Sequence, residues 1–353
     1  MAALSTGYGL FKYRTGNVGD EIQSIAARRF LPRVDQLLDR DRLSQFEPFE
    51  AFNELKVITN GWYTHEPQNW PPRSPRLNPL LISMHIAPTE PNVLKSFLSS
   101  DSKEFLIKHG PVGARDLATR DLLLENNVPS YFSGCMTLTL EARPDVPKNN
   151  FILLVDVPPA VEAEVRMRTE RPIVKFPAHI DPRWSSEAKF KLAEYYLYLY
   201  QSAHAVITTR LHATLPSLAL GTPVAFIQHE FTRGLSRFRG LLDLARVIPE
   251  EEFLTNPSLF DVNDPAPNSD DYLSVRQGLV SRCEEFTGQP AGQDQHFATE
   301  ISTLLTDPDF MMMIGSAIHD FDRLQDRRVR RFADELDKLK VVRRRLRRSS
   351  QMQ

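Results

Sequence analysis

Short apolar runs alternate with amphipathic stretches along most of the chain. The apolar runs are three to five residues long and have the length and composition of buried strands. Strands that alternate with helices form parallel sheets that are covered on both faces. The pattern therefore predicts an α/β protein, with strands at residues 57–59, 80–84, 151–155, 205–209 and 224–227.

Three helices follow from apolar stripes and end signals. In the first, Asp20 is the expected N-cap, and Gln23 three residues later completes a capping box. The third is expected to end at Gly221, because glycine readily adopts the left-handed conformation that follows many helices. The predicted helices cover about residues 21–30, 186–202 and 213–220.

A polar, proline-bearing run at residues 141–150 precedes a strong strand and is typical of a linker. It predicts a first domain over residues 1–145, a second over 146–310 and a helical extension over 311–353. The extension is basic, since residues 323–348 hold ten Arg and two Lys against four acidic residues. Such a charge can contact an anionic membrane surface or nucleic acid; the alternative is a solvated helix with a frayed basic end.

Composition narrows the class of protein. The 353 residues suffice for two domains of about 100–200 residues each. Two cysteines, Cys135 and Cys283, have no metal-binding or redox spacing, which is typical of inert thiols in a reducing compartment. The sequence shows no signal-peptide pattern and no run of ~18 apolar residues. We expect a cytoplasmic protein that has no nucleic-acid partner.

The first candidate motif, residues 16–21, joins a strand-like run to the first helix. Its glycines allow a sharp turn and a close approach to a ligand, and the start of a helix favours an anion. Asn17 can bond a sugar hydroxyl, and Asp20 can cap the helix or act as a base. The spacing of dinucleotide sites is absent. An ordinary glycine-rich turn between strand and helix is the alternative.

The second candidate motif follows a buried strand that ends in two threonines. Arg210 and His212 come next, before an apolar helix. In a doubly wound sheet, ligands bind at the carboxyl ends of the strands, which is where these two side chains are expected. Arginine suits bidentate contact with carboxylate or phosphate, and histidine exchanges protons near neutral pH. The alternative is a salt bridge from Arg210 and a capping role for His212.

Together these segments resemble the polysaccharide pyruvyl transferase family. Order and spacing agree with the family over roughly residues 7–245. The most specific part is Arg210-Leu211-His212 in combination with Gly221-Thr222-Pro223. The other matching pieces are residues 16–20, 112–116, 132–139 and 218–220.

The resemblance implies a fold like that of GT-B glycosyltransferases, with two Rossmann-like doubly wound domains facing across a cleft. The first domain would hold the acceptor, and the second would hold phosphoenolpyruvate, which is a donor substrate rather than a cofactor. Arg210 and His212, with the Leu211 backbone, would bind this donor. The pyruvyl group would pass to two hydroxyls of one sugar and form a ketal in an exopolysaccharide or a glycan precursor, lipid-linked or free. From the first domain, Asn17, Gly19, Asp20 and Arg115 would line the cleft.

Such a transfer needs a proton donor, a base for the hydroxyls and cations for the anionic donor. We expect His212 to be the acid or the phosphate partner, Arg210 the anion clamp and Asp20 the base. No metal cluster appears in the sequence, and the reaction requires none.

Other histidines are secondary candidates for substrate binding. His65, His85 and His179 each follow a strand-like run, so they point toward the expected cleft. A structural histidine with satisfied hydrogen bonds is the alternative for each. Trp62 or Tyr63 can stack on a sugar ring or pack in the core.

Two other functions stay open. A nucleotide-sugar glycosyltransferase on the same fold would need an acidic residue to hold the donor ribose, and Glu230 is the nearby candidate, without a clean spacing. A non-catalytic carbohydrate-binding protein is the other alternative, although it need not keep both Arg210 and His212. An anionic acceptor would find arginines after the second motif, unless these coat a solvated helix: Arg233, Arg237 and Arg239.

Overall fold

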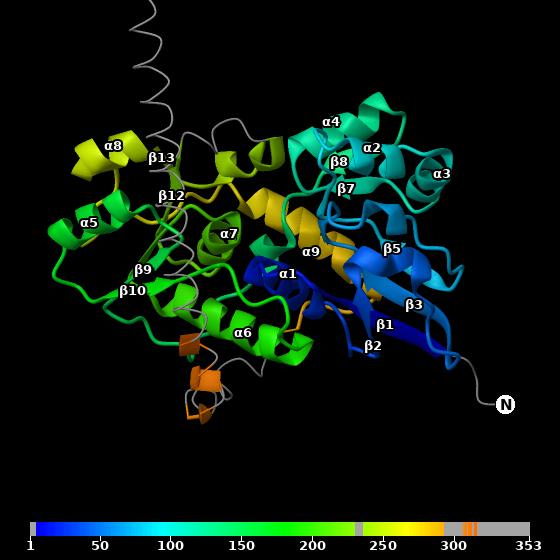
Figure 1. The fold of residues 1–353 in the computed structure, drawn as a ribbon, viewed down its shortest axis with the longest axis horizontal. Coiled ribbons are helices and arrows are strands. Elements are labelled where there is room, and N and C mark those ends of the chain that lie inside the picture. The colour runs from blue at the N-terminus through cyan, green and yellow to red at the C-terminus, as the bar shows by residue number, and fades with distance from the viewer. Residues whose placement is uncertain (1–4, 230–235, 293–305, 309, 313, 316–353) are drawn as a thin grey trace, which may run out of the picture.

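The computed structural model describes residues 5–229, 236–292, 306–308, 310–312, 314 and 315. In this part of the chain the architecture is mixed α/β with parallel sheets (Figure 1), which confirms the predicted α/β fold class. The basic extension predicted at residues 311–353 lies almost entirely outside the described residues, and so does Glu230. No described helix has the length and apolar character needed to cross a membrane.

Two parallel sheets in the first half of the chain continue one another. One has the order β2-β1-β3-β5 and the other β4-β6-β7-β8. Strand β3 runs into β4 after two residues, and β5 runs into β6 after three. Backbone hydrogen bonds bridge both interruptions, from Thr59 N–H to Leu80 O at 3.0 Å and from Gly61 N–H to Ser83 O at 3.1 Å. The strands are β1 (Ser5–Lys12), β2 (Gln36–Asp39), β3 (Phe52–Ile58), β4 (Gly61–Trp62), β5 (Leu77–Leu80), β6 (Met84–His85), β7 (Val112–Ala114) and β8 (Ser130–Phe132).

The strand predicted at residues 80–84 is therefore wrong as one unit. It is broken at Ser83, whose φ of 55° lies in the left-handed region. This conformation costs free energy for a residue other than glycine. The Ser83 hydroxyl offsets part of that cost, because it accepts a hydrogen bond from the Met136 N–H at 2.9 Å. Helices and 3₁₀ turns flank these strands: α1 (Val18–Arg28), α2 (Pro91–Phe97), α3 (Ser100–Lys108), α4 (Leu117–Glu125), η1 (Arg40–Gln45), η2 (Pro67–Asn69) and η3 (Met136–Thr139).

The second half of the chain builds one five-stranded parallel sheet in the order β10-β9-β11-β12-β13. This order, in which the first strand lies beside the second and third, is that of a doubly wound sheet. Strands β9 and β11 are buried at every residue, as expected for central strands covered on both faces. The strands are β9 (Ile152–Val155), β10 (Ile173–Phe176), β11 (Ala205–Thr208), β12 (Val224–Gln228) and β13 (Val247–Pro249).

The helices around this sheet test the predicted helix bounds. Helix α6 (Ser186–Ser202) has the predicted bounds, and Ser185 caps it by accepting a hydrogen bond from the Ala188 N–H. Helix α7 (Leu211–Ala219) begins two residues earlier than predicted. The remaining elements are α5 (Pro159–Arg168), α8 (Glu250–Thr255), α9 (Leu273–Thr287), η5 (Ser236–Phe238), η6 (Leu242–Leu244) and η7 (Pro257–Leu259).

Helix α1 joins the two halves. Its residues Val18 to Ala27 are all buried, and it packs against α6 and η3. One apolar cluster runs through this contact, from Ile22 of α1 to Tyr196 of α6. The ammonium of Lys189 in α6 also donates to the carbonyl of Thr15 at 3.0 Å. The predicted division into domains at residue 145 stays a prediction, because the halves share this core.

Helix α9 returns to the first half after the second sheet is complete (Figure 1). Lys56 of β3 donates to the carbonyl of Phe286 at 2.8 Å, and the Cys283 thiol lies 3.9 Å from the sulfur of Met136. Arg282 stacks over the Tyr131 ring at 4.6 Å. The chain therefore ties the second half back onto the first.

Candidate functional site

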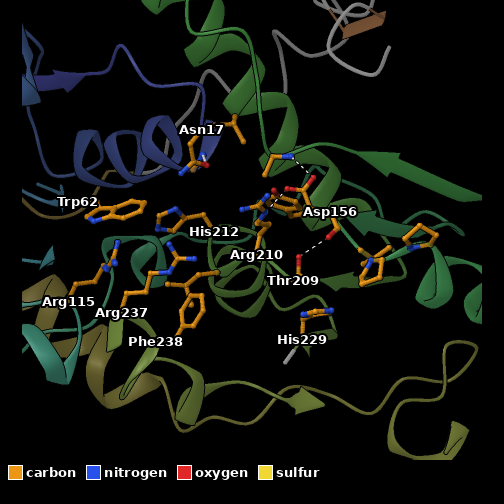
Figure 2. Close-up of a pocket in the computed structure, with 18 residues that line it drawn as sticks. Asn17, Trp62, Arg115, Asp156, Thr209, Arg210, His212, His229, Arg237 and Phe238 are labelled. Carbon is orange, nitrogen blue, oxygen red and sulfur yellow. Dashed lines mark hydrogen bonds and ion pairs between the residues drawn. The ribbon is translucent and has the colours of Figure 1, made fainter. Parts of the chain in front are cut away.

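A pocket of about 430 Å³ lies where the ends of the strands from both halves meet. The strand ends place it at the carboxyl edges of β9 and β11, the point at which the strand order of the second sheet reverses. Ligands of doubly wound sheets bind at this point. In Figure 2 the His212 ring lies amid the group, with Trp62 on one side and Arg210 on the other. The lining residues are Asn17, Val18, Gly19, Trp62, Arg115, Asp156, Val157, Pro158, Pro159, Ala178, Tyr200, Thr209, Arg210, Leu211, His212, His229, Arg237 and Phe238.

The glycine-rich turn forms one wall of the pocket. Asn17, and not Asp20, caps α1, because its side-chain oxygen accepts a hydrogen bond from the Gly19 N–H at 3.2 Å. The predicted cap and the predicted helix start at residue 21 are therefore wrong. The turn is held from the second half, since the Val18 N–H donates to Ala178 O at 3.1 Å.

Gly19 brings α1 into direct contact with His212. A Cβ added at Gly19 would lie 2.3 Å from Nδ1 and 2.6 Å from Cβ of His212, far inside normal contact distance. Only a residue without a side chain fits there. The two sequence motifs, predicted separately, thus meet in one wall of the pocket.

His212 is a half-buried imidazole that is neutral at physiological pH. Burial lowers its pKa from 6.5 to about 3, and the nearby positive charges of Arg115 and Arg237 act in the same direction. Its Nε2 lies 3.7 Å from the Cys135 sulfur, so Cys135 is next to the site rather than isolated in the core. His212 is therefore a proton acceptor when a ligand arrives. It can transfer a proton to the ligand only after it has itself been protonated.

Three arginines give the pocket its charge. Arg115, which follows β7, is 3% exposed; its Nε makes no hydrogen bond among the described residues but lies 3.7 Å from the Asp116 carboxylate. The buried Nε of Arg237 likewise makes no hydrogen bond within the described part of the chain, and its guanidinium stacks over the Trp62 ring at 5.4 Å. Burial, with repulsion from Arg115 and Arg210, lowers the pKa of Arg237. Against these three cations the described lining has one carboxylate, Asp156. The pocket is therefore suited to an anion with more than one charged group.

Several predicted residues lie away from the pocket. Asp20 is 2% exposed; its carboxylate accepts from the Thr15 hydroxyl at 2.6 Å and lies 3.4 Å from the Arg40 guanidinium. It therefore supports the turn from behind rather than facing a substrate. His85 is buried with its Nδ1 2.6 Å from the Asp116 carboxylate, as in the structural alternative.

Of the other aromatic candidates, one lines the pocket and the rest lie outside it. His65 is exposed beside Trp62, with ring centroids 5.8 Å apart, and does not line the pocket. His179 is exposed too, and its backbone forms an isolated bridge with Asn17. Tyr63 packs in the core against Trp70, whereas Trp62 does line the pocket. Of the predicted site residues, the structure brings together Asn17, Gly19, Arg115, Arg210, Leu211 and His212.

The sequence interpretation missed Asp156 and Tyr200. Asp156 directly follows the predicted strand at residues 151–155, so the rule that ligands bind at strand ends identifies it. Tyr200 lies inside α6 and gave no signal, because its place on an apolar stripe is that of a core residue. Arg237 was predicted to contact an anionic acceptor or to coat a solvated helix, and the structure places it beside Arg115 and His212.

The fold and the site define an α/β protein with an arginine-lined pocket where its parallel sheets meet. The family model described as polysaccharide pyruvyl transferase matches residues 17–230, which is more than half of the chain. The chain belongs to the polysaccharide pyruvyl transferase family. The match includes Arg115, Arg210 and His212 but ends before Arg237.

Similarity beyond the family is remote. No curated protein is significantly similar to the chain. An uncharacterised protein of Klebsiella pneumoniae is 13% identical with a TM-score of 0.39, over 66% of this chain and 87% of that one. The UDP-GlcNAc 2-epimerase of Methanocaldococcus jannaschii, solved with UDP-GlcNAc and UDP, is 10% identical with a TM-score of 0.41. That match covers 78% of this chain and 98% of the epimerase.

Proposed function

We propose that the protein transfers the pyruvyl group of phosphoenolpyruvate to two hydroxyls of one sugar unit and so forms a ketal. Membership of the family supports a pyruvyl transferase that acts in polysaccharide biosynthesis. The observation that carries the proposed donor is the set of three arginines around a neutral His212, with one carboxylate among the described lining residues. Phosphoenolpyruvate carries a carboxylate and a phosphate, and it needs this excess of positive charge.

The proposed reaction begins with protonation of the methylene carbon of the donor. Positive charge then develops on the neighbouring carbon, a sugar hydroxyl attacks it, and inorganic phosphate leaves. A second hydroxyl of the same sugar closes the ketal, and each hydroxyl gives up its proton to a base. Arg115, Arg210 and Arg237 hold the anionic groups, because guanidinium donors suit carboxylate and phosphate. His212 exchanges protons with the substrates.

The charge of His212 fits this sequence of events. The free pocket keeps the imidazole neutral, since burial and two arginines oppose a further positive charge. A bound dianion reverses that balance and raises the pKa of His212. His212 therefore takes a proton from solvent or from a hydroxyl when the donor is present, and it can then return the proton to the leaving phosphate or the methylene carbon.

Mass spectrometry of candidate glycans incubated with the protein and phosphoenolpyruvate tests the proposal. A product heavier by one ketal-linked pyruvate, with release of one phosphate, is the expected result. Parallel reactions with UDP- and GDP-sugars test the glycosyltransferase alternative, because transfer of a sugar from either one would replace the proposed function. Binding of the glycan without any transfer would favour the carbohydrate-binding alternative.

We also propose that the reaction takes place in the cytoplasm, where phosphoenolpyruvate is made, on a sugar or oligosaccharide acceptor. Peripheral membrane contact through the basic extension would suit an acceptor attached to a lipid. Sedimentation of the full chain with vesicles that contain anionic lipid, and with neutral vesicles as the control, tests this contact. Equal recovery of the protein in both supernatants would contradict it.

A further inference from the structure

Asp156 lies at the carboxyl end of β9, an inner strand of the second sheet. It follows β9 directly, at the reversal of strand order, and its side chain is 3% exposed. Its φ of 52° lies in the left-handed region, which costs free energy for any residue other than glycine. Such strain persists where the surrounding contacts fix the residue, and it is frequent at functional sites.

The contacts of Asp156 connect three adjacent strands. One carboxylate oxygen accepts a hydrogen bond from the Ala178 N–H, after β10, at 3.2 Å. The other accepts from Nε of Arg210, after β11, at 2.5 Å. The Asp156 carbonyl accepts from the Thr209 hydroxyl at 2.8 Å. The residue thus fixes the two chain segments that form this side of the pocket.

The contact through Nε determines how Arg210 is presented. The Arg210 side chain is 43% exposed. Among the described residues, its one side-chain hydrogen bond is the one that Nε donates to Asp156. Both terminal nitrogens are therefore left for a ligand. The neighbouring charge of Arg237 repels Arg210, so an untethered guanidinium would turn toward solvent.

We propose that Asp156 is the positioning residue that holds the Arg210 guanidinium toward the phosphoenolpyruvate site. The inference rests on the proposed function, because it concerns the grip on that donor. Asp156 acts through Arg210. Because it already orders the Arg210 side chain in the folded protein, the entropy of that side chain is not lost when the donor binds. Removal of Asp156 should therefore raise the KM for phosphoenolpyruvate much more than it lowers kcat.

Asp156→Asn is the informative variant. Asparagine tolerates the left-handed backbone, so the strand end keeps its shape. The Ala178 N–H and the Arg210 Nε face different carboxylate oxygens, so an amide in the same position turns its NH₂ group toward one of these donors and loses that hydrogen bond. We expect a rise in KM of about tenfold, because ordering one long side chain on binding weakens affinity by up to about that factor. The control is Asp145→Asn, which removes an exposed carboxylate from a loop pair with Arg143 and should leave KM unchanged.

Chemical rescue separates positioning from general support of the fold. In Arg210→Ala, added ethylguanidinium should occupy the vacated site beside Asp156 and restore part of the turnover. In the double variant Arg210→Ala with Asp156→Asn, the same additive should restore much less. Equal rescue of both variants would overturn the inference. A fall in kcat with unchanged KM in Asp156→Asn would overturn it too, since that pattern describes a proton-transfer group.

Calorimetric binding of phosphoenolpyruvate distinguishes failure of the inference from failure of the proposed function. If the wild-type protein binds no phosphoenolpyruvate, the proposed donor is wrong. If the wild type binds it and Asp156→Asn binds it equally well, the inference about Asp156 alone is wrong. Weaker binding by Asp156→Asn with an unchanged melting temperature supports both.

Discussion

Replacement of Gly19 by alanine is the sharpest test of the site, because it alters one contact in a known direction. The added methyl group would lie 2.3 Å from Nδ1 and 2.7 Å from Cγ of His212. Carbon atoms in normal contact are about 3.5–4.0 Å apart, so the ring must retreat by roughly 1 Å or more. His212 cannot retreat freely, since Cys135 lies 3.7 Å away behind it.

The magnitude follows from this displacement. A shift of about 1 Å in a catalytic group can cost about 10²-fold in rate, so we expect kcat/KM for Gly19→Ala to fall by about that factor. The effect on stability should be smaller. Overpacking costs about 1–3 kcal/mol, and alanine returns up to about 1 kcal/mol through its higher helix propensity.

The assay is the rate of phosphate release from phosphoenolpyruvate in the presence of a sugar acceptor, with the urea midpoint measured in parallel. Gly278→Ala in α9 is a matched control, because an added Cβ there meets no atom within 4 Å. That variant should be more stable by about 0.5–1 kcal/mol and fully active. Gly19→Ala should also have little further effect in the His212→Ala background. Wild-type activity in Gly19→Ala, or effects that add fully in the double variant, would refute the proposed contact between α1 and His212.

Three more predictions follow from the charges of the pocket. His212→Ala should reduce turnover by about 10²–10⁴-fold with little change in the urea midpoint, and transfer at the wild-type rate would show that His212 is not catalytic. Since the pKa of His212 is about 3 when folded and 6.5 ordinarily, the unfolded chain binds an extra proton between these values. Stability without ligand should therefore decrease as pH falls from about 6.5 toward 3, and His212→Ala should show a smaller decrease in urea midpoints measured at neutral and mildly acidic pH. Arg237→Ala should raise the KM for phosphoenolpyruvate by about 10–100-fold, because a hydrogen bond to a charged group contributes ~1.5–3 kcal/mol. Arg239→Ala is the matched control; it removes an exposed arginine paired with Asp121, and equal KM values for the two variants would contradict the assignment of Arg237 to the pocket.

The fold was predictable where local chemistry decides it. The bounds of α6 follow from the Ser185 cap and a continuous apolar stripe, and β9 follows from a fully apolar run. The start of α1 was misplaced because Asp20 has the chemistry of a cap, whereas its carboxylate is drawn to Arg40, a residue distant in sequence. The break at Ser83 gave no signal, because its unusual backbone depends on contacts with residues far along the chain.

The candidate site shows the same limit. Arg210 and His212 were predictable, since a strand end followed by a helix places them at the edge of a sheet. The contact of His212 with Gly19 and Cys135 was not, because it depends on how the two halves meet. Arg237 had no pattern of its own, and its place over Trp62 is decided by packing between the halves.

Helix α1 belongs both to the pocket wall and to the core that joins the two halves. Its amino-terminal turn touches His212, while its buried face is fused with α6 in a common apolar cluster. If the sheets swung apart as rigid bodies, they would expose that cluster to water and pull the turn away from the imidazole. Such a separation would break the contact between Gly19 and His212, so we expect substrates to enter and leave through small local movements at the pocket mouth.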